Sequence, residues 1–145
     1  MNSTQAKIKY LKKKCDELWS KAVRTRDGEC ALCGKRENLN AHHWIHCKAQ
    51  GNLHRWDIKN GIALCYACHV YKVHYYASAD ITDRLKAFAF DKGIVTPEEY
   101  EAISNNHQIA KFGLEDMQKV KEYLTNYLDS LDPNFYAVGG TNDEE

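Results

Sequence analysis

Two Cys-x-x-Cys pairs, separated by 31 residues, constrain the fold of this chain more than any other feature. The pairs are Cys30/Cys33 and Cys65/Cys68. Each pair can turn two thiolates toward one ion, and two pairs complete the tetrahedron that structural zinc prefers. Gly34 follows the first pair, where a tight turn often needs a glycine. The spacing predicts a four-cysteine zinc site that encloses a β-hairpin, and buried or redox-active thiols are the alternative.

The segments outside these pairs give no sign of export. Residues 1–14 are polar and basic, and they lack the apolar core of a secretory signal. No apolar run approaches the about 18 residues that a membrane-spanning helix needs. We therefore expect a cytoplasmic protein with no membrane contact. In that reducing compartment, paired cysteines bind metal more often than they form disulfides.

The net charge of the chain is zero, but the charge is unevenly distributed. Residues 1–75 hold 14 Lys+Arg and 6 Asp+Glu, a net +8, whereas residues 76–145 hold 6 and 14, a net −8. The basic half could steer toward phosphate, because the field that a ligand meets is local. Ordinary solvated charge explains the same asymmetry, so the charge alone does not indicate a nucleic-acid partner.

Hydrophobic spacing predicts a mostly helical α+β chain. Apolar residues recur every three or four positions near both ends, and two short apolar runs between them are typical of strands. The expected elements are a helix over 4–26, strands over 39–45 and 61–64, and helices over 66–76, 80–90, from 96, and 114–131. Asp80 is the expected cap of the helix over 80–90. Thr96, Pro97 and Glu99 form a helix start with a capping box.

Four regions follow from this pattern. They are a basic N-terminal helix (1–28), a zinc core (29–77), a helical region (78–133) and an acidic tail (134–145). The continuous apolar stripe of the last helix is expected to pack in the core. A homodimer through that helix is the alternative.

Histidines gather between and beside the cysteine pairs. Six of the seven lie within residues 29–76. His42 and His43 fall on the first predicted strand, and His69 directly follows Cys68. Four thiolates already satisfy one zinc ion, so the imidazoles are not needed there. A second, open metal site is their natural use.

The order of these elements resembles the zinc-containing branch of the HNH endonuclease family, common in phages and bacteria. The segment 30–74 that carries the resemblance is about a third of the chain, and several spaced elements are more specific than one short motif. The resemblance implies a ββα-metal (His-Me finger) core with flanking helices. It also implies a metal-dependent DNA endonuclease in the cytoplasm of a bacterium or a phage-infected cell. The matching elements are Cys30/Cys33, His42-His43, Asn60-Gly61 and Cys65/Cys68-His69.

The resemblance implies a role for each matched residue. In the family, the first histidine of the pair binds the catalytic metal and the second is the general base, which here are His42 and His43. Strand neighbours point to opposite faces, and a neutral imidazole can take a proton from water. His69 would share the catalytic ion, Mg²⁺ or Mn²⁺, with other divalent metals possible. Asn60 would either orient the loop that carries the base, which we favour, or approach the metal.

Two departures from the family pattern leave alternatives open. Many family members with a His-His pair carry a further histidine three or four residues beyond the last motif histidine, whereas His74 lies five beyond His69. On an α-helix these positions are about 140° apart, which disfavours His74 as a ligand. The pair also permits a second register, in which His42 is the base and no ligand precedes it.

Substrate contacts are expected from basic residues near the histidines. HNH-type sites approach the minor groove and grip the phosphate backbone, although each basic residue taken singly is also an ordinary surface residue. No base-reading motif is present, so cutting is expected to be weakly sequence-specific or specific for DNA shape. The candidate phosphate contacts are Arg55, Lys72, Lys59 and Lys48.

Two other functions are compatible with the sequence. One is a non-catalytic, zinc-stabilised module that binds DNA or a protein. The other is a structure-selective nuclease that acts on branched DNA. The zinc module has no need of His43, Asn60 and His69, so these residues favour phosphodiester hydrolysis. Whether the product is a nick or a double-strand break stays open.

Overall fold

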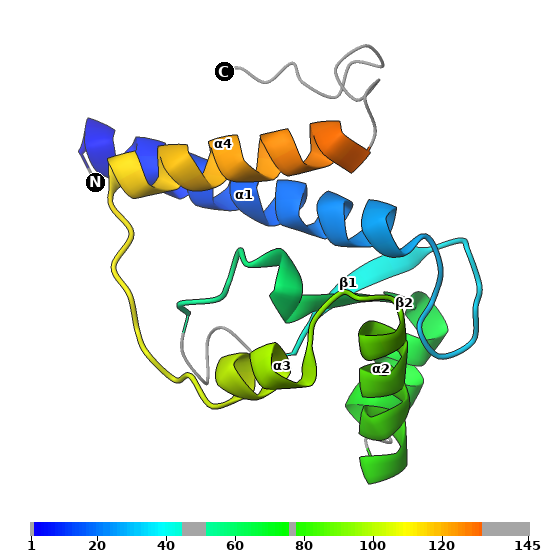
Figure 1. Ribbon diagram of the computed structural model, residues 1–145. Coiled ribbons are helices and arrows are strands. Elements are labelled where there is room, and N and C mark those ends of the chain that lie inside the picture. The colour runs from blue at the N-terminus through cyan, green and yellow to red at the C-terminus, as the bar shows by residue number, and fades with distance from the viewer. Residues whose placement is uncertain (1, 45–51, 76–77, 132–145) are drawn as a thin grey trace.

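The computed structural model describes residues 2–44, 52–75 and 78–131, and the side chains of 72–75 lie outside that description. In Figure 1, two long helices lie on one side of a two-stranded sheet and two shorter helices on the other. The chain is therefore mostly helical with a small antiparallel sheet, as the α+β prediction requires. The elements are α1 (Ser3–Asp27), β1 (Leu39–His43), η1 (Ile58–Asn60), β2 (Gly61–Cys65), η2 (Cys68–Tyr75), α2 (Ala79–Asp91), α3 (Pro97–Ser104) and α4 (Leu114–Leu131).

The sheet sends two neighbouring histidines in opposite directions. β1 pairs with β2 in antiparallel register, with His43 opposite Gly61. Successive side chains of a strand point to opposite faces. His43 accordingly meets Trp19 of α1, while His42 meets His69 of η2. The sheet thus separates the two histidines of the pair into two different environments.

Helix α1 confirms the helix predicted over 4–26. A capping box between Asn2 and Gln5 begins it. Gly28 ends it with a φ of 69°, the left-handed conformation that closes many helices. Its buried residues follow the three- and four-residue spacing of one helix face, and they are Leu11, Cys15, Leu18, Trp19, Ala22 and Val23.

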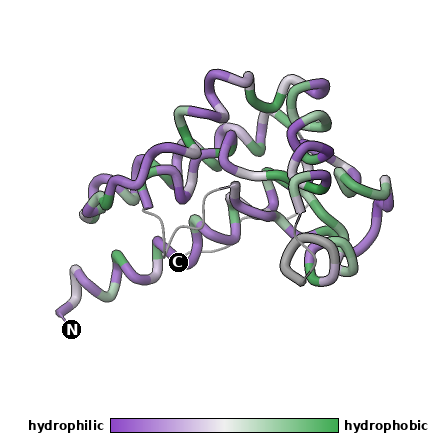
Figure 2. Tube along the Cα trace, turned by 90° about the horizontal axis from the view of Figure 1, so that it is seen from below, coloured by the Kyte–Doolittle hydropathy of each residue, from purple (hydrophilic) through white to green (hydrophobic). Residues whose placement is uncertain are grey.

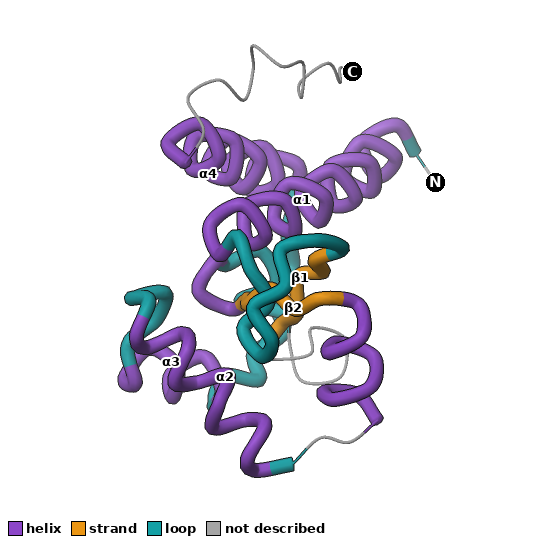
Figure 3. The backbone as a smooth tube through the Cα atoms, turned by 90° about the vertical axis from the view of Figure 1, so that its right-hand side faces the viewer, coloured by secondary structure: helices purple, strands orange, loops and turns teal. Residues whose placement is uncertain are grey.

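Helix α4 lies along α1 and runs in the same direction (Figures 1 and 3). It buries Met117, Leu124 and Leu128, so the prediction that its stripe packs in the core is confirmed. A dimer through the same face would have to displace α1. We call this cluster the α1–α4 core; its buried members are Leu11, Cys15, Leu18, Trp19, Ala22, Val23, Trp56, Ala63, Met117, Leu124 and Leu128.

A second apolar cluster covers the opposite face of the sheet. It joins β2 to α2 and α3 and contains three of the four paired cysteines. Figure 2 shows hydrophobic residues recurring at intervals along otherwise hydrophilic helices, as expected where each helix buries one face. We call this cluster the cysteine-side core; its buried members are Cys30, Leu32, Ile62, Leu64, Cys65, Cys68, Leu85, Ala89, Ile94, Val95 and Ile103.

The predicted N-terminal cap is wrong for α2 and confirmed for α3. The cap predicted at Asp80 is wrong, because the side chain of Ser78 accepts a backbone N–H of the first turn of α2. Asp80 lies inside that turn, where a carboxylate still interacts favourably with the helix dipole. Helix α3 begins as predicted, with a capping box between Thr96 and Glu99 and with Pro97 at its first position.

The helix predicted over 66–76 is π-helical over Cys68–Tyr75. In a π-helix the backbone hydrogen bonds join residues five apart, rather than four. The backbone of position 74 therefore lies about one turn beyond that of position 69. The expected angle of about 140° between His69 and His74 assumed an α-helix and is wrong for this segment.

Some predictions fall outside the described residues. These are the acidic tail (134–145), Lys48, and the side chains of Lys72 and His74. Among the described helices, none is both long enough and apolar enough to cross a membrane.

Candidate functional site

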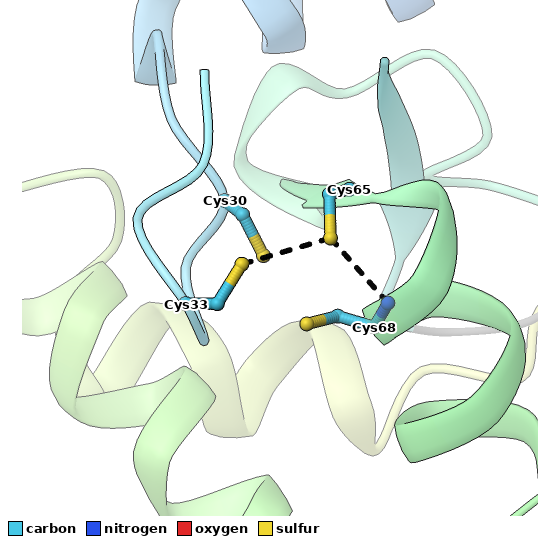
Figure 4. Close-up of side chains that lie close together, drawn as sticks. All are labelled: Cys30, Cys33, Cys65 and Cys68. Atoms are coloured by element: carbon cyan, nitrogen blue, oxygen red, sulfur yellow. Dashed lines mark hydrogen bonds between the residues drawn. The ribbon is translucent and has the colours of Figure 1, made fainter. Parts of the chain in front are cut away.

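The four paired cysteines converge on one point. Their Sγ atoms all lie within 4.8 Å of one another, and the Sγ atoms of Cys33 and Cys65 are 3.6 Å apart. A tetrahedral zinc ion with Zn–S bonds of about 2.3 Å places its sulfur ligands about 3.8 Å apart. Figure 4 shows the thiols of the two pairs turned toward a common centre. These residues could hold a metal ion, and their geometry suits structural zinc.

Local turns shape both cysteine pairs. The N–H of Gly34 donates to the carbonyl of Cys30 at 2.9 Å, and Gly34 has a φ of 78°. The N–H of Leu32 points at the Cys30 sulfur from 3.4 Å. In the second pair, the N–H of Cys68 lies 3.5 Å from the Cys65 sulfur, at the start of η2. Backbone donors of this kind stabilise thiolates, the form in which cysteine binds metal.

The thiols of the second pair differ in acidity. Burial raises the pKa of the Cys65 thiol, but hydrogen bonds from the Cys68 backbone and from neighbouring thiols outweigh it and lower the pKa to about 7. Burial and hydrogen bonds to the same neighbours raise the pKa of Cys68. The hydrogen bonds to Cys65 favour its thiolate, which is the form in which a cysteine binds metal.

The ring of His43 is held from two sides. It stacks on the indole of Trp19, with ring centroids 3.8 Å apart and an interplanar angle of 5°. Its Nε2 lies 2.9 Å from the carbonyl oxygen of Arg55. A carbonyl oxygen only accepts hydrogen bonds, so Nε2 carries the hydrogen in the neutral ring. In that tautomer Nδ1 is the basic nitrogen.

Asn60 ties down the loop that holds His43. It is a fully buried polar residue, with 0% of its surface exposed. Its Nδ2 donates to the carbonyl of His54 at 3.0 Å, one residue before Arg55. Its own carbonyl accepts the N–H of Trp44, just after β1, at 3.3 Å. This geometry supports the loop-orienting alternative for Asn60 over an approach to a metal.

The same loop is attached to α1 through Asp16. The Nε and Nη2 of Arg55 donate to the two carboxylate oxygens of Asp16 at 3.1 and 2.7 Å. The indole Nε1 of Trp56 donates to the same carboxylate at 2.9 Å. Arg55 was expected to contact phosphate, and in the structure its guanidinium forms this ion pair. A bidentate pair fixes the orientation of Arg55, and thereby of the backbone that carries its carbonyl.

A second clamp reaches from the end of α1 to β2. The guanidinium of Arg26 donates to the carbonyls of Ile58 and Gly61 at 2.6 and 2.7 Å. The carboxylate of Asp27 accepts the N–H of Ala63 at 2.8 Å. The Asn-Gly step between η1 and β2 is thus gripped on both sides by consecutive residues of α1.

Gly61 is required for space. Its φ of −150° is extended backbone that any residue adopts. A Cβ at this position would lie 2.5 Å from Cζ2 of Trp19 and 2.8 Å from Cγ2 of Val23. The glycine therefore lets α1 approach the strand closely enough for Trp19 to reach His43.

His42 and His69 come together on the other face of the sheet. Their ring centroids are 5.3 Å apart and their planes meet at 68°. Two imidazoles at this spacing could share an ion. Within the part of the chain that the structure describes, only the four cysteines form a group of three or more possible ligands. Of the ligands predicted for a catalytic metal, the described part of the structure brings together His42 and His69.

The remaining described candidate, Lys59, forms an ion pair with Glu99 of α3. Its amino group and that carboxylate remain partly exposed, at 44% and 37% of their side-chain surfaces. The Glu99 hydrogen bond raises the pKa of Lys59, and the same bond lowers the pKa of Glu99. A DNA phosphate would have to compete with this carboxylate.

The sequence prediction missed the residues of α1 that support the site. Trp19 lies on the same helix face as the predicted apolar stripe, so its burial could have been foreseen. Its contact with His43 depends on how α1 meets the sheet. Asp16 and Arg26 carry no local signal, because their partners lie more than 30 residues away.

Comparison of the chain with protein-family models, with curated proteins and with solved structures gave no match. The geometry described above and the sequence motifs are therefore the observations that bear on function.

Proposed function

We propose that the chain is a metal-dependent DNA endonuclease that hydrolyses phosphodiester bonds at a ββα-metal site of the HNH type. The observation that carries the proposal is the constraint on His43. A partly buried loop, held by Asn60 and clamped to α1, presents a carbonyl that selects one tautomer of this histidine. A module that only bound zinc would need no such arrangement.

His43 is the general base of the proposed reaction. Its neutral ring accepts a proton from water at Nδ1, and the hydroxide attacks phosphorus. The bond from phosphorus to the 3′ oxygen breaks, and that oxygen takes a proton from solvent. The products are a 3′-hydroxyl and a 5′-phosphate. Asn60 and Arg55 act through His43, because they hold the loop whose carbonyl aligns it.

His42 and His69 would hold the divalent ion, which would neutralise charge on the phosphate and on the leaving oxygen. His74, whose side chain lies outside the described residues, stays a doubtful third ligand, as in the sequence-based prediction. Imidazole ligands favour Mn²⁺, Co²⁺ or Ni²⁺ over Mg²⁺, which prefers oxygen. We therefore expect Mn²⁺ to support cutting at a lower concentration than Mg²⁺.

The four-cysteine site has a structural part in the proposal. Zinc there would fix the end of β2 to the start of η2, which carries His69. It would leave no open position for substrate, because four thiolates complete its coordination. Loss of this zinc should therefore abolish activity by disordering the ligand pair.

The test is cleavage of supercoiled plasmid DNA by purified protein with Mn²⁺ or Mg²⁺. The His43→Ala variant should lose about 100-fold or more of the rate, as expected when a general base is removed. Excess EDTA should stop the wild-type reaction. The His107→Ala variant is the control for loss of a histidine, since His107 is exposed and lies outside the motif.

Zinc content and melting temperature of both variants must match the wild type for the comparison to count. Cutting that survives in His43→Ala would mean that His42 is the base, as in the second register. Wild-type protein that leaves plasmid, branched and single-stranded DNA uncut with every divalent ion would refute the proposed activity and favour the binding module. Cutting of branched DNA alone would identify a structure-selective nuclease.

A further inference from the structure

Trp19 contacts His43 although it lies outside the motif, on α1. The two rings are nearly parallel, with a 5° angle and centroids 3.8 Å apart. This is a full face-to-face contact between an indole and an imidazole. Trp19 is almost wholly buried, with 3% of its surface exposed, so the indole is a fixed platform within the α1–α4 core.

Two further contacts fix the platform itself. The Nε1–H of Trp19 donates to the carbonyl of Asp57 at 2.9 Å, which sets the rotation of the indole. Gly61 faces the ring edge, where a Cβ would lie 2.5 Å from Cζ2. Asp57 and Gly61 lie on either side of Asn60 in the sequence. The segment 57–61 therefore both orients the loop, through Asn60, and holds the indole of Trp19 in place.

The platform and the carbonyl constrain different motions of His43. Stacking fixes the plane of the imidazole, and the hydrogen bond to Arg55 fixes the ring within that plane. Either constraint alone leaves one rotation open. Both together hold the His43 ring in one orientation, and alignment of a catalytic group governs the rate of proton transfer.

We propose that Trp19 is a positioning residue for the general base, which rests on the proposed function of His43. The N-terminal helix is then part of the catalytic apparatus, through its hold on the imidazole plane. The requirement is for a flat aromatic surface, so phenylalanine should replace Trp19 better than an aliphatic side chain does.

The kinetic test compares Trp19→Leu and Trp19→Phe with the wild type, using a defined duplex and saturating Mn²⁺. We expect Trp19→Leu to lower kcat about 10- to 100-fold with KM within about twofold, because a small misplacement of a catalytic group has effects of this size. Trp19→Phe should recover most of kcat. Leu18→Ala is the control for lost packing, since Leu18 is buried in the same core.

A second measurement does not depend on activity. Nitrogen-15 NMR of zinc-loaded protein reports which ring nitrogen of His43 carries the hydrogen. We expect one tautomer, protonated at Nε2, in the wild type, Trp19→Phe and Leu18→Ala, and a mixture in Trp19→Leu. Each variant is compared well below its own melting temperature, so a general loss of stability would appear equally in Leu18→Ala.

Unchanged kcat in Trp19→Leu, or a fall in Leu18→Ala as large as in Trp19→Leu, would overturn the positioning role. So would an unchanged His43 tautomer in Trp19→Leu. If the wild type cuts no DNA, the proposed function fails, and the NMR comparison alone then decides whether Trp19 sets the state of His43.

Discussion

The two cores on either side of the sheet differ in the side chains they bury and in the length of their helices. The α1–α4 core unites a helix of 25 residues with one of 18, and its members include two tryptophans, several aliphatic side chains and Met117. The cysteine-side core is formed by helices of 13 and 8 residues and contains three buried thiols. The α1–α4 core is formed by the long apolar faces of two helices, whereas the cysteine-side core surrounds a possible metal site.

The difference indicates where each half obtains its stability. Burial of apolar area stabilises the α1–α4 core without help from a ligand. Short helices are marginal by themselves, so the cysteine-side core should depend on zinc, whose binding energy becomes folding energy. The candidate site lies on the sheet between the two, with His43 facing one core and His42 facing the other.

The largest expected effect comes from breaking the zinc site. Cys65→Ser should cost several kcal/mol, because zinc sites in small folds contribute on the order of 10 kcal/mol. Hydrogen exchange should show loss of protection in β2 and α2, while α1 and α4 remain protected.

The matched control makes the same chemical change in the other core. Cys15→Ser replaces a fully buried thiol that lies 3.9 Å from the carbonyl oxygen of Met117. It should retain zinc and cost only about 1–3 kcal/mol, the penalty of burying a more polar group. Equal destabilisation by the two variants, or zinc binding by Cys65→Ser at wild-type affinity, would erase the distinction between the cores.

The next largest effect is expected in the α1–α4 core, which is tested without changing any cysteine. Leu124→Ala removes a fully buried side chain of α4 and should cost about 2–5 kcal/mol. Chemical denaturation would measure this loss, and a colorimetric assay should find one zinc per chain as in the wild type. Release of zinc by this variant under native conditions would mean that the two cores fold as one unit.

Gly61→Ala tests the contact between α1 and the sheet. The added Cβ meets the rigid indole of Trp19, so the expected cost is about 1–3 kcal/mol, the usual range for overpacking. Thermal melting would measure it. Gly93→Ala is an informative comparison, because nothing lies within 4 Å of a Cβ there and only the positive φ of 70° opposes the substitution. A Gly61→Ala variant as stable as the wild type would contradict the close approach.

A smaller effect is expected at the start of α3. Thr96→Ala removes the hydroxyl that accepts the N–H of Glu99 at 3.0 Å, and loss of such a cap costs about 1 kcal/mol. Thr96→Ser should retain most of that stability. Urea denaturation would measure both variants, and identical midpoints would show that the cap contributes nothing.

The smallest expected effect depends on pH. The hydrogen bond from Lys59 holds the pKa of Glu99 below its ordinary value of 4.5. A lowered folded-state pKa contributes stability that is complete above the ordinary value and is lost as the pH falls through the folded-state pKa. Melting temperatures below pH 5 should therefore fall less for Glu99→Gln than for the wild type, with Glu98→Gln as the matched control. Parallel curves for the two variants would contradict this contribution.

Much of the fold followed from local patterns in the sequence. The apolar spacing of α1 and α4, the two strands and the capping box at Thr96 are determined by neighbouring residues, and the structure bears them out. The convergence of the four cysteines was predictable because two pairs of fixed spacing have few other uses. Serine and aspartate cap helices about equally well, so residue type alone does not distinguish Asp80 from Ser78, the cap in the structure.

The support of the candidate site was not predictable from the sequence. The stacking of Trp19 on His43 and the clamps from Asp16 and Arg26 depend on the angle at which α1 crosses the sheet. That angle depends on contacts with α4, far along the chain. The π-helical winding of η2 likewise has no simple residue signature, and it changes the backbone spacing of positions 69 and 74.

The pairing of α1 with α4 also has a consequence for synthesis. A ribosome makes α1 well before α4, its main packing partner. At about 5–20 residues per second, several seconds separate the two helices. Through that interval the nascent chain presents the apolar face of α1 without α4 to cover it. A chaperone that shields exposed apolar helices should therefore bind this protein on the ribosome and release it once α4 has emerged.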